Sequence, residues 1–257
     1  ADLTEQQSLA REIYEHLVSF RTVAGQDKTN AAQQAMLTRL RDAGFRPDDA
    51  RVLQYDDAHG VLYPRLPGDG STAKKPILMI AHIDVVDALK EDWSDGLDPF
   101  TLTQTDGYFY GRGSSDDKLG VASLVATFIR LKSEGYVPRR DLIFAITSDE
   151  ETGQDTIKWL IEKHRGLIDA DFVLNADAGG GRLRDGKAVA FSIQASEKVY
   201  LTYHLEVRNR GGHSSRPRPD NAIYQLTNAL VRLENYAFPA ALNEVTQGFF
   251  REMAKIS

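Results

Sequence analysis

The chain has 257 residues, a formal net charge of −6 at pH 7, 42% hydrophobic residues and no cysteine. The acidic balance argues against nucleic acid or an anionic membrane as the main partner, and no apolar run is long enough to span a bilayer. Without cysteine the fold has no disulfide, and any metal ion must be held by histidine, aspartate or glutamate.

The first residue is Ala1 rather than methionine, and residues 1–4 resemble the mature start of an exported protein. Cleavage of a signal peptide after small residues gives such a start, and so does removal of a tag. The sequence therefore leaves two explanations open, a periplasmic or secreted protein and a processed recombinant chain.

Two helices followed by two strands are predicted for the first part of the chain. Thr4 and Gln7 form a capping box ahead of an apolar stripe, which predicts a helix from Thr4 to about Phe20. A second helix follows Asn30 and ends at Gly44. The runs with the character of strands are residues 51–55 and 61–66.

An apolar run at residues 78–86 contains His82 and Asp84. Such a run is typical of a strand that is covered on both faces, and open α/β sheets bind ligands at the carboxyl ends of their strands. Because His82 and Asp84 are two residues apart, both point to one side of the strand. This spacing suits a metal-binding imidazole with a supporting carboxylate, although His-x-Asp alone more often marks a structural histidine.

A polar, glycine-bearing turn with Asp116 and Asp117 lies between a predicted hairpin and a predicted helix. The hairpin spans residues 100–110 and turns at an Asp-Gly pair. The helix spans residues 119–131 and is apolar nearly all round, which is typical of a buried helix. The turn therefore places two carboxylates at the start of a buried helix.

Two more predicted buried strands end in acidic residues. Residues 142–146 run into Glu150 and Glu151. Residues 172–174 run into Asp177. The resulting β-α-β-α-β order predicts an α/β fold with a mostly parallel sheet and helices on both faces. Because the carboxyl ends of parallel strands share one edge, we expect the histidine and the acidic groups to gather there.

The pattern then changes to that of a second, smaller domain. Residues 199–207 alternate apolar and polar side chains, as a half-exposed antiparallel strand does. A glycine-rich segment with His213 follows, and then a predicted helix from about Asn221 to Tyr236. A boundary near Glu197 leaves an α+β domain with too few elements to be complete. The predicted domains are residues 1–196 and 197–257.

Histidine and carboxylates without sulfur suit Zn²⁺, with Co²⁺ and Mn²⁺ as alternatives. A lone catalytic zinc ion needs three protein ligands, so a larger acidic group favours two ions. A paired site needs one carboxylate that bridges ions roughly 3.5–4 Å apart, and Asp116 is the candidate. Glu150 and Glu151 point in different directions, so one can bind metal while the other accepts a proton from water. Each motif alone is more typical of a solvated turn, and their common sheet edge favours the metal site.

Four ordered motifs resemble one family of hydrolases. They are IAHIDVV at residues 80–86, YGRGSSDDK at 110–118, DEETG at 149–153 and GGHSS at 211–215. The chain is similar over nearly its whole length to the co-catalytic di-zinc exopeptidases. That family includes glutamate carboxypeptidase, carboxypeptidase S, aminoacylases, acetylornithine deacetylase, succinyl-diaminopimelate desuccinylase and the carnosine dipeptidases. The resemblance implies a zinc exopeptidase-like fold with a smaller lid and dimerisation domain.

The resemblance also implies a ligand set for two zinc ions. His82 and Asp177 match the ligands of one ion, Glu151 matches a ligand of the other, and Asp116 matches the bridge between them. The match of Asp177 is the loosest, because many relatives have glutamate there. The peptide bond between Asp116 and Asp117 is expected to be cis.

Three further residues match catalytic roles in the family. Glu150 matches the general base that activates water, and Asp84 matches the partner that orients His82. His213 matches a histidine of the smaller domain that stabilises the oxyanion in the partner's active site. The resemblance therefore implies a homodimer that forms through the smaller domain.

The chain departs from the family pattern near its end. The family has one more metal-ligand histidine close to its C-terminus, whereas none of the six histidines here follows His213. The smaller domain also has fewer elements than its relatives. We therefore expect the chain to be a fragment that lacks the late histidine.

The function predicted from these features is metal-dependent hydrolysis of a peptide bond through a metal-activated water, as in an exopeptidase, dipeptidase or carboxypeptidase. The expected substrate is a peptide or an N-acyl amino acid beside a free carboxylate. One alternative is an aminoacylase-like N-acyl-amino-acid deacylase, and another is a truncated, inactive form. No nucleic-acid or membrane partner is expected.

Overall fold

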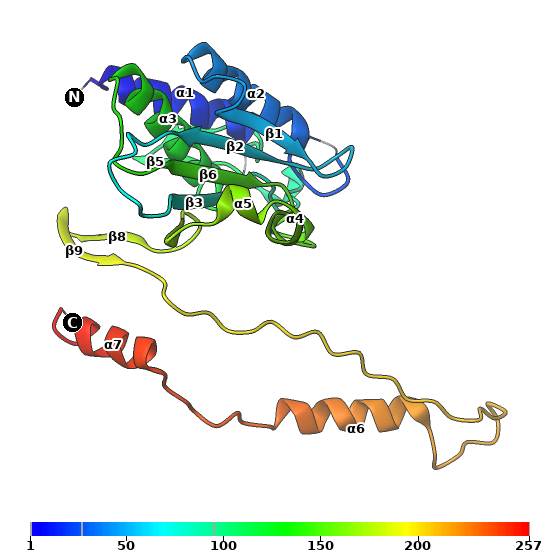
Figure 1. The fold of residues 1–257 in the computed structure, drawn as a ribbon. Helices are drawn as coiled ribbons and strands as arrows, with labels where there is room; N and C mark the ends of the chain where they lie inside the picture. Colours follow the sequence, from blue (N-terminus) through cyan, green and yellow to red (C-terminus); the bar gives the residue numbers. More distant parts are fainter. Residues whose placement is uncertain (1, 27, 95, 257) are drawn as a thin grey trace. The chain divides into compact units, whose positions relative to one another are not determined.

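The computed structural model describes residues 2–26, 28–94 and 96–256 (Figure 1). Internal contacts divide the chain into two units, residues 1–178 and 179–257. The boundary predicted near Glu197 stays a prediction, because these units are defined by packing alone. Ala1, on which the prediction of export rests, lies outside the described residues. Among the helices of the described part, none has the length and apolar character needed to cross a membrane.

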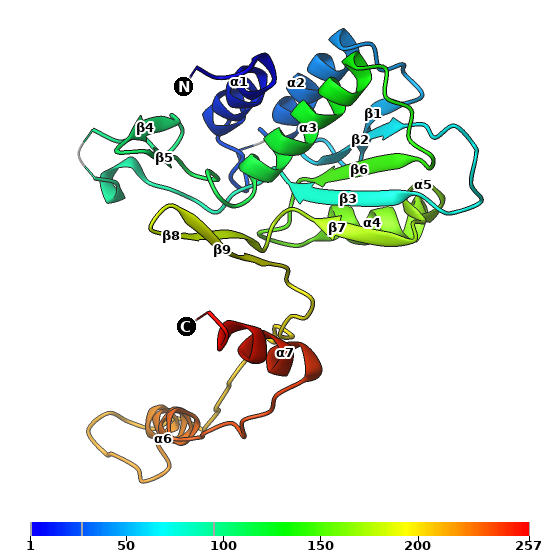
Figure 2. The same ribbon diagram turned by 90° about the vertical axis from the view of Figure 1, so that its left-hand side faces the viewer.

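A five-stranded sheet forms the centre of the first unit (Figures 1 and 2). Its strand order is β1-β2-β6-β3-β7. β3 pairs in parallel with β6 and β7, whereas β2 is antiparallel to β1 and β6. Only β2 therefore opposes the other strands of this sheet, and the predicted mostly parallel sheet is confirmed. The strands are β1 (Ala50–Gln54), β2 (Gly60–Leu66), β3 (Ile77–His82), β6 (Leu142–Thr147) and β7 (Phe172–Asn175).

Helices cover both faces of this sheet, as the sequence predicted (Figure 2). Successive side chains of a strand point to opposite faces, so β6 feeds two cores. Phe144 and Ile146 pack with α1, α2 and α3, whereas Ile143 and Ala145 pack with α4. Burial on both faces explains why β6 is apolar throughout. The helices are α1 (Glu5–Ser19), α2 (Thr29–Asp42), α3 (Lys118–Ser133), α4 (Asp155–Lys163) and α5 (Arg165–Ile168).

The start of α1 confirms the predicted capping box. The backbone N–H of Gln7 donates to Thr4 Oγ1 at 3.2 Å, and the N–H of Thr4 donates to Gln7 Oε1 at 2.9 Å. Two backbone N–H groups at the start of the helix are thereby satisfied before the apolar stripe begins. Further along α1, the Tyr14 hydroxyl donates to the carbonyl of Ser114 at 2.6 Å. This bond ties α1 to the turn that carries Asp116.

β3 is shorter than the apolar run that predicted it. The strand ends at His82 rather than at Val86. Beyond it, the N–H of Val85 donates to the carbonyl of Thr22 at 3.0 Å. The chain has left the sheet at Val85, because this N–H bonds to the segment after α1 instead of to a neighbouring strand. The bend places His82 at the strand end.

β7 was predicted to be a buried strand, and this prediction was wrong. The side chains of Phe172, Val173 and Leu174 are 46%, 51% and 53% exposed. β7 pairs only with β3 in the described sheet and so forms its edge. β7 is as apolar in sequence as β6. A strand is buried, however, only where other strands flank it and other elements cover both of its faces.

Each unit contains a two-stranded β-hairpin. β4 (Thr103–Thr105) and β5 (Tyr108–Tyr110) pair antiparallel around Asp106 and Gly107, as predicted. A short 3₁₀ helix, η1 (Lys90–Asp92), precedes them. β8 (Gly180–Arg184) and β9 (Lys187–Ser192) form a second hairpin. β8 begins with two glycines, a residue type that is rare in strands, so the local sequence does not mark it as a strand.

The second unit holds two helices, α6 (Ala222–Glu234) and α7 (Glu244–Met253). α6 confirms the predicted helix, whereas α7 was not predicted. The strand predicted at residues 199–207 is absent from the described structure. Its alternating pattern predicts which side chains share a face, but a strand forms only where a neighbouring strand supplies hydrogen bonds. None of the described residues in this unit is buried.

Candidate metal centre and active site

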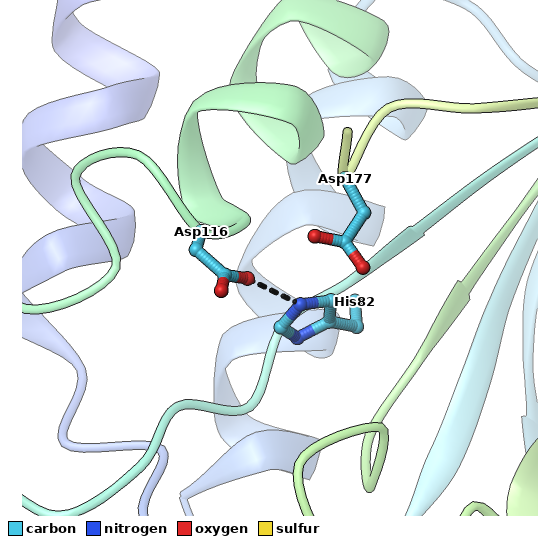
Figure 3. Close-up of side chains that lie close together, drawn as sticks. All are labelled: His82, Asp116 and Asp177. Carbon is cyan, nitrogen blue, oxygen red and sulfur yellow. Dashed lines mark hydrogen bonds and ion pairs between the residues drawn. The ribbon is translucent and has the colours of Figure 1, made fainter. Parts of the chain in front are cut away.

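His82 lies at the carboxyl end of β3 with only 2% of its surface exposed. Its Nδ1 lies 3.0 Å from the carbonyl oxygen of Asp84 and 3.4 Å from Asp84 Oδ1. Its Nε2 lies 2.8 Å from Asp116 Oδ1 (Figure 3). Both ring nitrogens therefore have oxygen partners, and Nε2 faces the carboxylates that the sequence assigned to a metal.

His82, Asp116 and Asp177 form one close group. Each offers a ligand atom, and these atoms lie within 4.8 Å of one another. Figure 3 shows both carboxylates directed toward the imidazole ring. The three side chains come from the end of β3, the turn before α3 and the segment after β7, so the parallel strand order brings them together. The peptide bond from Asp116 to Asp117 is cis, as expected.

Asp84 connects this group to the acidic turn after β6. Its side chain is buried, and its two oxygens accept the backbone N–H groups of Glu150 at 3.1 Å and Glu151 at 3.0 Å. Sequence reasoning assigned Asp84 only to the orientation of His82. The bonds to Glu150 and Glu151 were missed because main-chain donors carry no mark in the sequence. Asp84 thus supports residues from two adjacent strands.

The turn after β6 has two further supports that the sequence analysis did not assign. The Asp149 carboxylate accepts the N–H groups of Asp155 at 2.5 Å and Thr156 at 3.2 Å, so it caps the start of α4. Gln154 has φ of +54° and donates from Nε2 to Glu150 Oε1 at 3.1 Å. Asp149 lies several residues before the N-cap position Gln154, so no local capping signal marked it. Nothing local in the sequence indicated Gln154.

A half-open pocket adjoins the group of ligands. His82, Glu150 and Asp177 line it together with the apolar side chains of Ile80 and Ile157. A pocket that combines apolar walls with a few polar groups is the usual form of a small-molecule site. Glu150 and two members of the ligand group therefore face one shared space.

A model of the peptidase family M20/M25/M40 matches residues 78–254. The chain belongs to this family. The match includes all four motifs that carried the resemblance.

Among the relatives of this M20-family chain is human N-fatty-acyl-amino acid synthase/hydrolase PM20D1, 37% identical over 173 residues. That alignment covers 64% of the chain and 33% of the relative. Probable carboxypeptidase S-like 2 of Dictyostelium discoideum is 36% identical over 171 residues, covering 63% and 32%. The chain thus spans about a third of the length of these relatives.

The structure of the M20 family metallo-carboxypeptidase Sso-CP2 from Sulfolobus solfataricus shares this fold. It superimposes with a TM-score of 0.57 at 21% identity. The superposition covers 69% of the M20-family chain and 38% of the other.

Of the predicted site residues outside the close group, Glu151 and His213 are linked to it neither by the pocket nor by a hydrogen bond of their own side chains to its members. Glu151 is half-buried on the turn after β6, and its ligand oxygens are not among those gathered around His82. His213 belongs to the second unit, where it is exposed and its Nδ1 lies 2.8 Å from Ser215 Oγ. The assigned roles of both residues remain proposals.

Burial and neighbouring charges shift the pKa values of the ionisable groups in the site. Burial lowers the pKa of His82, but Asp84 and Asp116 outweigh it and raise that pKa to about 10. Burial raises the pKa of Asp117 to about 7, against the opposing effect of His82. Burial also raises the pKa values of Glu150 and Glu151, and neighbouring carboxylates act in the same direction.

The residues present fit a divalent metal ion. Imidazole nitrogen and carboxylate oxygen are the donors that suit Zn²⁺, Co²⁺ and Mn²⁺ in the absence of sulfur. Three such donors converge at the His82 group. Burial is the main cause of the raised pKa values of Asp117, Glu150 and Glu151, and repulsion between neighbouring carboxylates adds to it. A cation at this position would relieve that repulsion.

Proposed function

We propose that this chain is the catalytic part of a metal-dependent hydrolase that cleaves a peptide bond beside a free carboxylate. An exopeptidase, dipeptidase or carboxypeptidase has this activity. The observation that carries the proposal is the convergence of His82, Asp116 and Asp177 beside a pocket that Glu150 also lines. The family membership supports the same class of reaction.

We expect two zinc ions in each active site, with Co²⁺ or Mn²⁺ able to replace them. His82, Asp116 and Asp177 would hold one ion. Asp116 and Glu151 would contribute to the other. When bound, the ions would polarise the substrate carbonyl and lower the pKa of water.

Glu150 is the proposed general base. It accepts a proton from the attacking water and then donates that proton to the leaving amine nitrogen as the C–N bond breaks. Asp84 holds the backbone of Glu150 and Gln154 contacts its carboxylate, so the base is oriented from two sides. Burial raises the pKa of Glu150, which favours the first step, because a weaker acid has a stronger conjugate base.

His213 and a second copy of the chain complete the proposal. We expect His213 of one protomer to donate to the developing oxyanion in the active site of its partner. The second unit would then serve as both lid and dimerisation surface. This part rests on the family resemblance at residues 211–215.

N-acyl amino acids are a second candidate substrate class. The relative that is 37% identical is named as an N-fatty-acyl-amino acid synthase/hydrolase. Such a substrate is also an amide beside a carboxylate, so the same residues would act on it. The apolar surface that Ile80 and Ile157 give to the pocket suits an acyl group as well as an apolar side chain.

A screen of dipeptides and N-acyl amino acids with Zn²⁺, Co²⁺ or Mn²⁺ distinguishes the two classes. Metal analysis should accompany it, because the proposed enzyme holds two ions per site. At most one tightly bound zinc ion, with no turnover of either class, would instead indicate the inactive form.

Replacement of Glu150 tests the proposed base. We expect Glu150→Gln to retain zinc and to lower kcat by about 10²–10⁴-fold, the usual contribution of a positioned general base. Glu162→Gln is the matched control, because Glu162 is exposed on α4. A Glu150→Gln variant with the kcat of the native protein would refute the assignment.

A further inference from the structure

Asp117 begins α3 but does not cap it. The residue holds the N-cap position, yet its side chain accepts no bond from the helix. Instead Oδ2 accepts the backbone N–H of His82 at 3.2 Å. Asp117 is fully buried, and among the described residues Oδ1 has no hydrogen-bond partner. Burial of a carboxylate oxygen without a hydrogen-bond partner lowers the stability of the fold. The position of Asp117 therefore calls for a functional explanation.

Gly120 leaves the space that Asp117 occupies. A Cβ atom at residue 120 would lie 2.1 Å from Asp117 Oδ1 and 2.7 Å from the Cβ of Ala176. Real Cβ atoms do not approach other atoms this closely, so either the carboxylate or the segment after β7 would have to move. The carboxylate of Asp117 and the side chain of Ala176 therefore both adjoin Gly120 in the first turn of α3.

The same carboxylate thus adjoins the three segments that carry the ligand group. It bonds to the backbone of His82 and follows Asp116 directly in sequence. It also adjoins Gly120, whose other neighbour is Ala176, the residue before Asp177. Ala176 is itself held, because its N–H donates to the carbonyl of Ile80 on β3 at 3.0 Å. A change at residues 117 or 120 would alter the spacing between the ligands without removing any of them.

We propose that Asp117 is a positioning residue of the metal centre. Its buried carboxylate sets the separation of the segments that carry His82, Asp116 and Asp177, and Gly120 is required to accommodate it. The inference rests on the proposed metal site. Residues that support metal ligands from behind typically change metal affinity by about 10–100-fold when altered.

Zinc affinity of the full chain tests the inference, measured by competition with a chromophoric chelator alongside thermal unfolding of the metal-free protein. Gly120→Ala keeps every charge but displaces the carboxylate, so we expect about a tenfold or larger loss of affinity. Gly166→Ala on α5 is the control, because a Cβ there meets nothing within 4 Å. Its zinc affinity should equal that of the native chain.

Two substitutions of Asp117 separate position from charge. Asp117→Asn keeps an acceptor for the His82 N–H and should retain zinc affinity within about threefold, whereas Asp117→Ala should lose about tenfold or more. An equal loss in both would show that charge alone matters and would overturn the inference. Native affinity in Gly120→Ala would overturn it as well. If Asp117→Ala does not fold, the near-isosteric Asp117→Asn and Gly120→Ala still decide the question.

The native chain separates this inference from the proposed function. If it binds no zinc, the metal site itself is refuted and the inference falls with it. If it binds zinc and hydrolyses its substrate, but Gly120→Ala binds zinc equally well, only the role of Asp117 is refuted.

Discussion

The two units of the chain contain similar amphipathic helices but differ in what those helices meet. In the first unit, α1 packs on α3 and buries Ile13 and Leu17 completely in their shared core. In the second unit, Phe249 and Phe250 of α7 remain 50% and 57% exposed. An apolar stripe therefore becomes a core only where a second apolar surface closes on it. The ligand group is built on the unit where this has happened, which suits a site that needs fixed geometry.

Truncation of a core side chain should show the largest difference in unfolding free energy between the two units. Phe144 is fully buried on β6, with its ring centroid 4.6 Å from that of Phe128. Phe144→Ala should lower the free energy of unfolding by about 3–5 kcal/mol, because it removes apolar contacts and leaves a cavity. Phe250→Ala in α7 should change it by less than about 0.5 kcal/mol. Chemical denaturation followed by circular dichroism measures both, and similar losses would show that the second unit also contributes a packed core.

Removal of Asp84 should have the next largest effect. Asp84→Ala leaves the buried N–H groups of Glu150 and Glu151 without their acceptor, which should cost about 2–3 kcal/mol of unfolding free energy. Asp220→Ala in the second unit should leave the unfolding of the first unchanged, because the Asp220 carboxylate accepts hydrogen bonds from Arg218, two residues away. Denaturation curves of the two variants test the contrast. An Asp84→Ala protein as stable as the native chain would contradict it.

Zinc binding should depend on pH through His82. With its pKa raised to about 10, the metal-free protein is stabilised by protonation of His82 below the ordinary value of 6.5, and this contribution is lost as pH rises through about 10. Because zinc must displace the proton, its affinity should rise by up to about tenfold per pH unit between these values. Calorimetry in buffers of different ionisation enthalpy should find about one proton released per ion at His82. A pH-independent affinity would show that His82 is not a ligand.

Site residues could be predicted where they lie at the end of a strand or the start of a helix that the sequence itself indicates. His82 at the end of an apolar run and Asp116 before an apolar helix were identified in this way, and the structure brings them together with Asp177. The supporting bonds were not predictable, since Asp84 bonds to main-chain groups and Asp117 to a strand distant in sequence.

Local chemistry in the sequence by itself determined the capping box at Thr4, the longer helices and the strands of the central sheet, and the order of the ligand motifs, but not the short helices η1 and α5. Tertiary structure alone decided that β7 is an exposed edge and that residues 199–207 form no strand. It also decided that the buried carboxylate of Asp117 bonds to the backbone of His82 and adjoins Gly120 beside Ala176. The physical reason is common to these cases. Helix caps and apolar periodicity act between residues close in the chain, whereas strand pairing, burial and side-chain contacts depend on partners that only folding brings near.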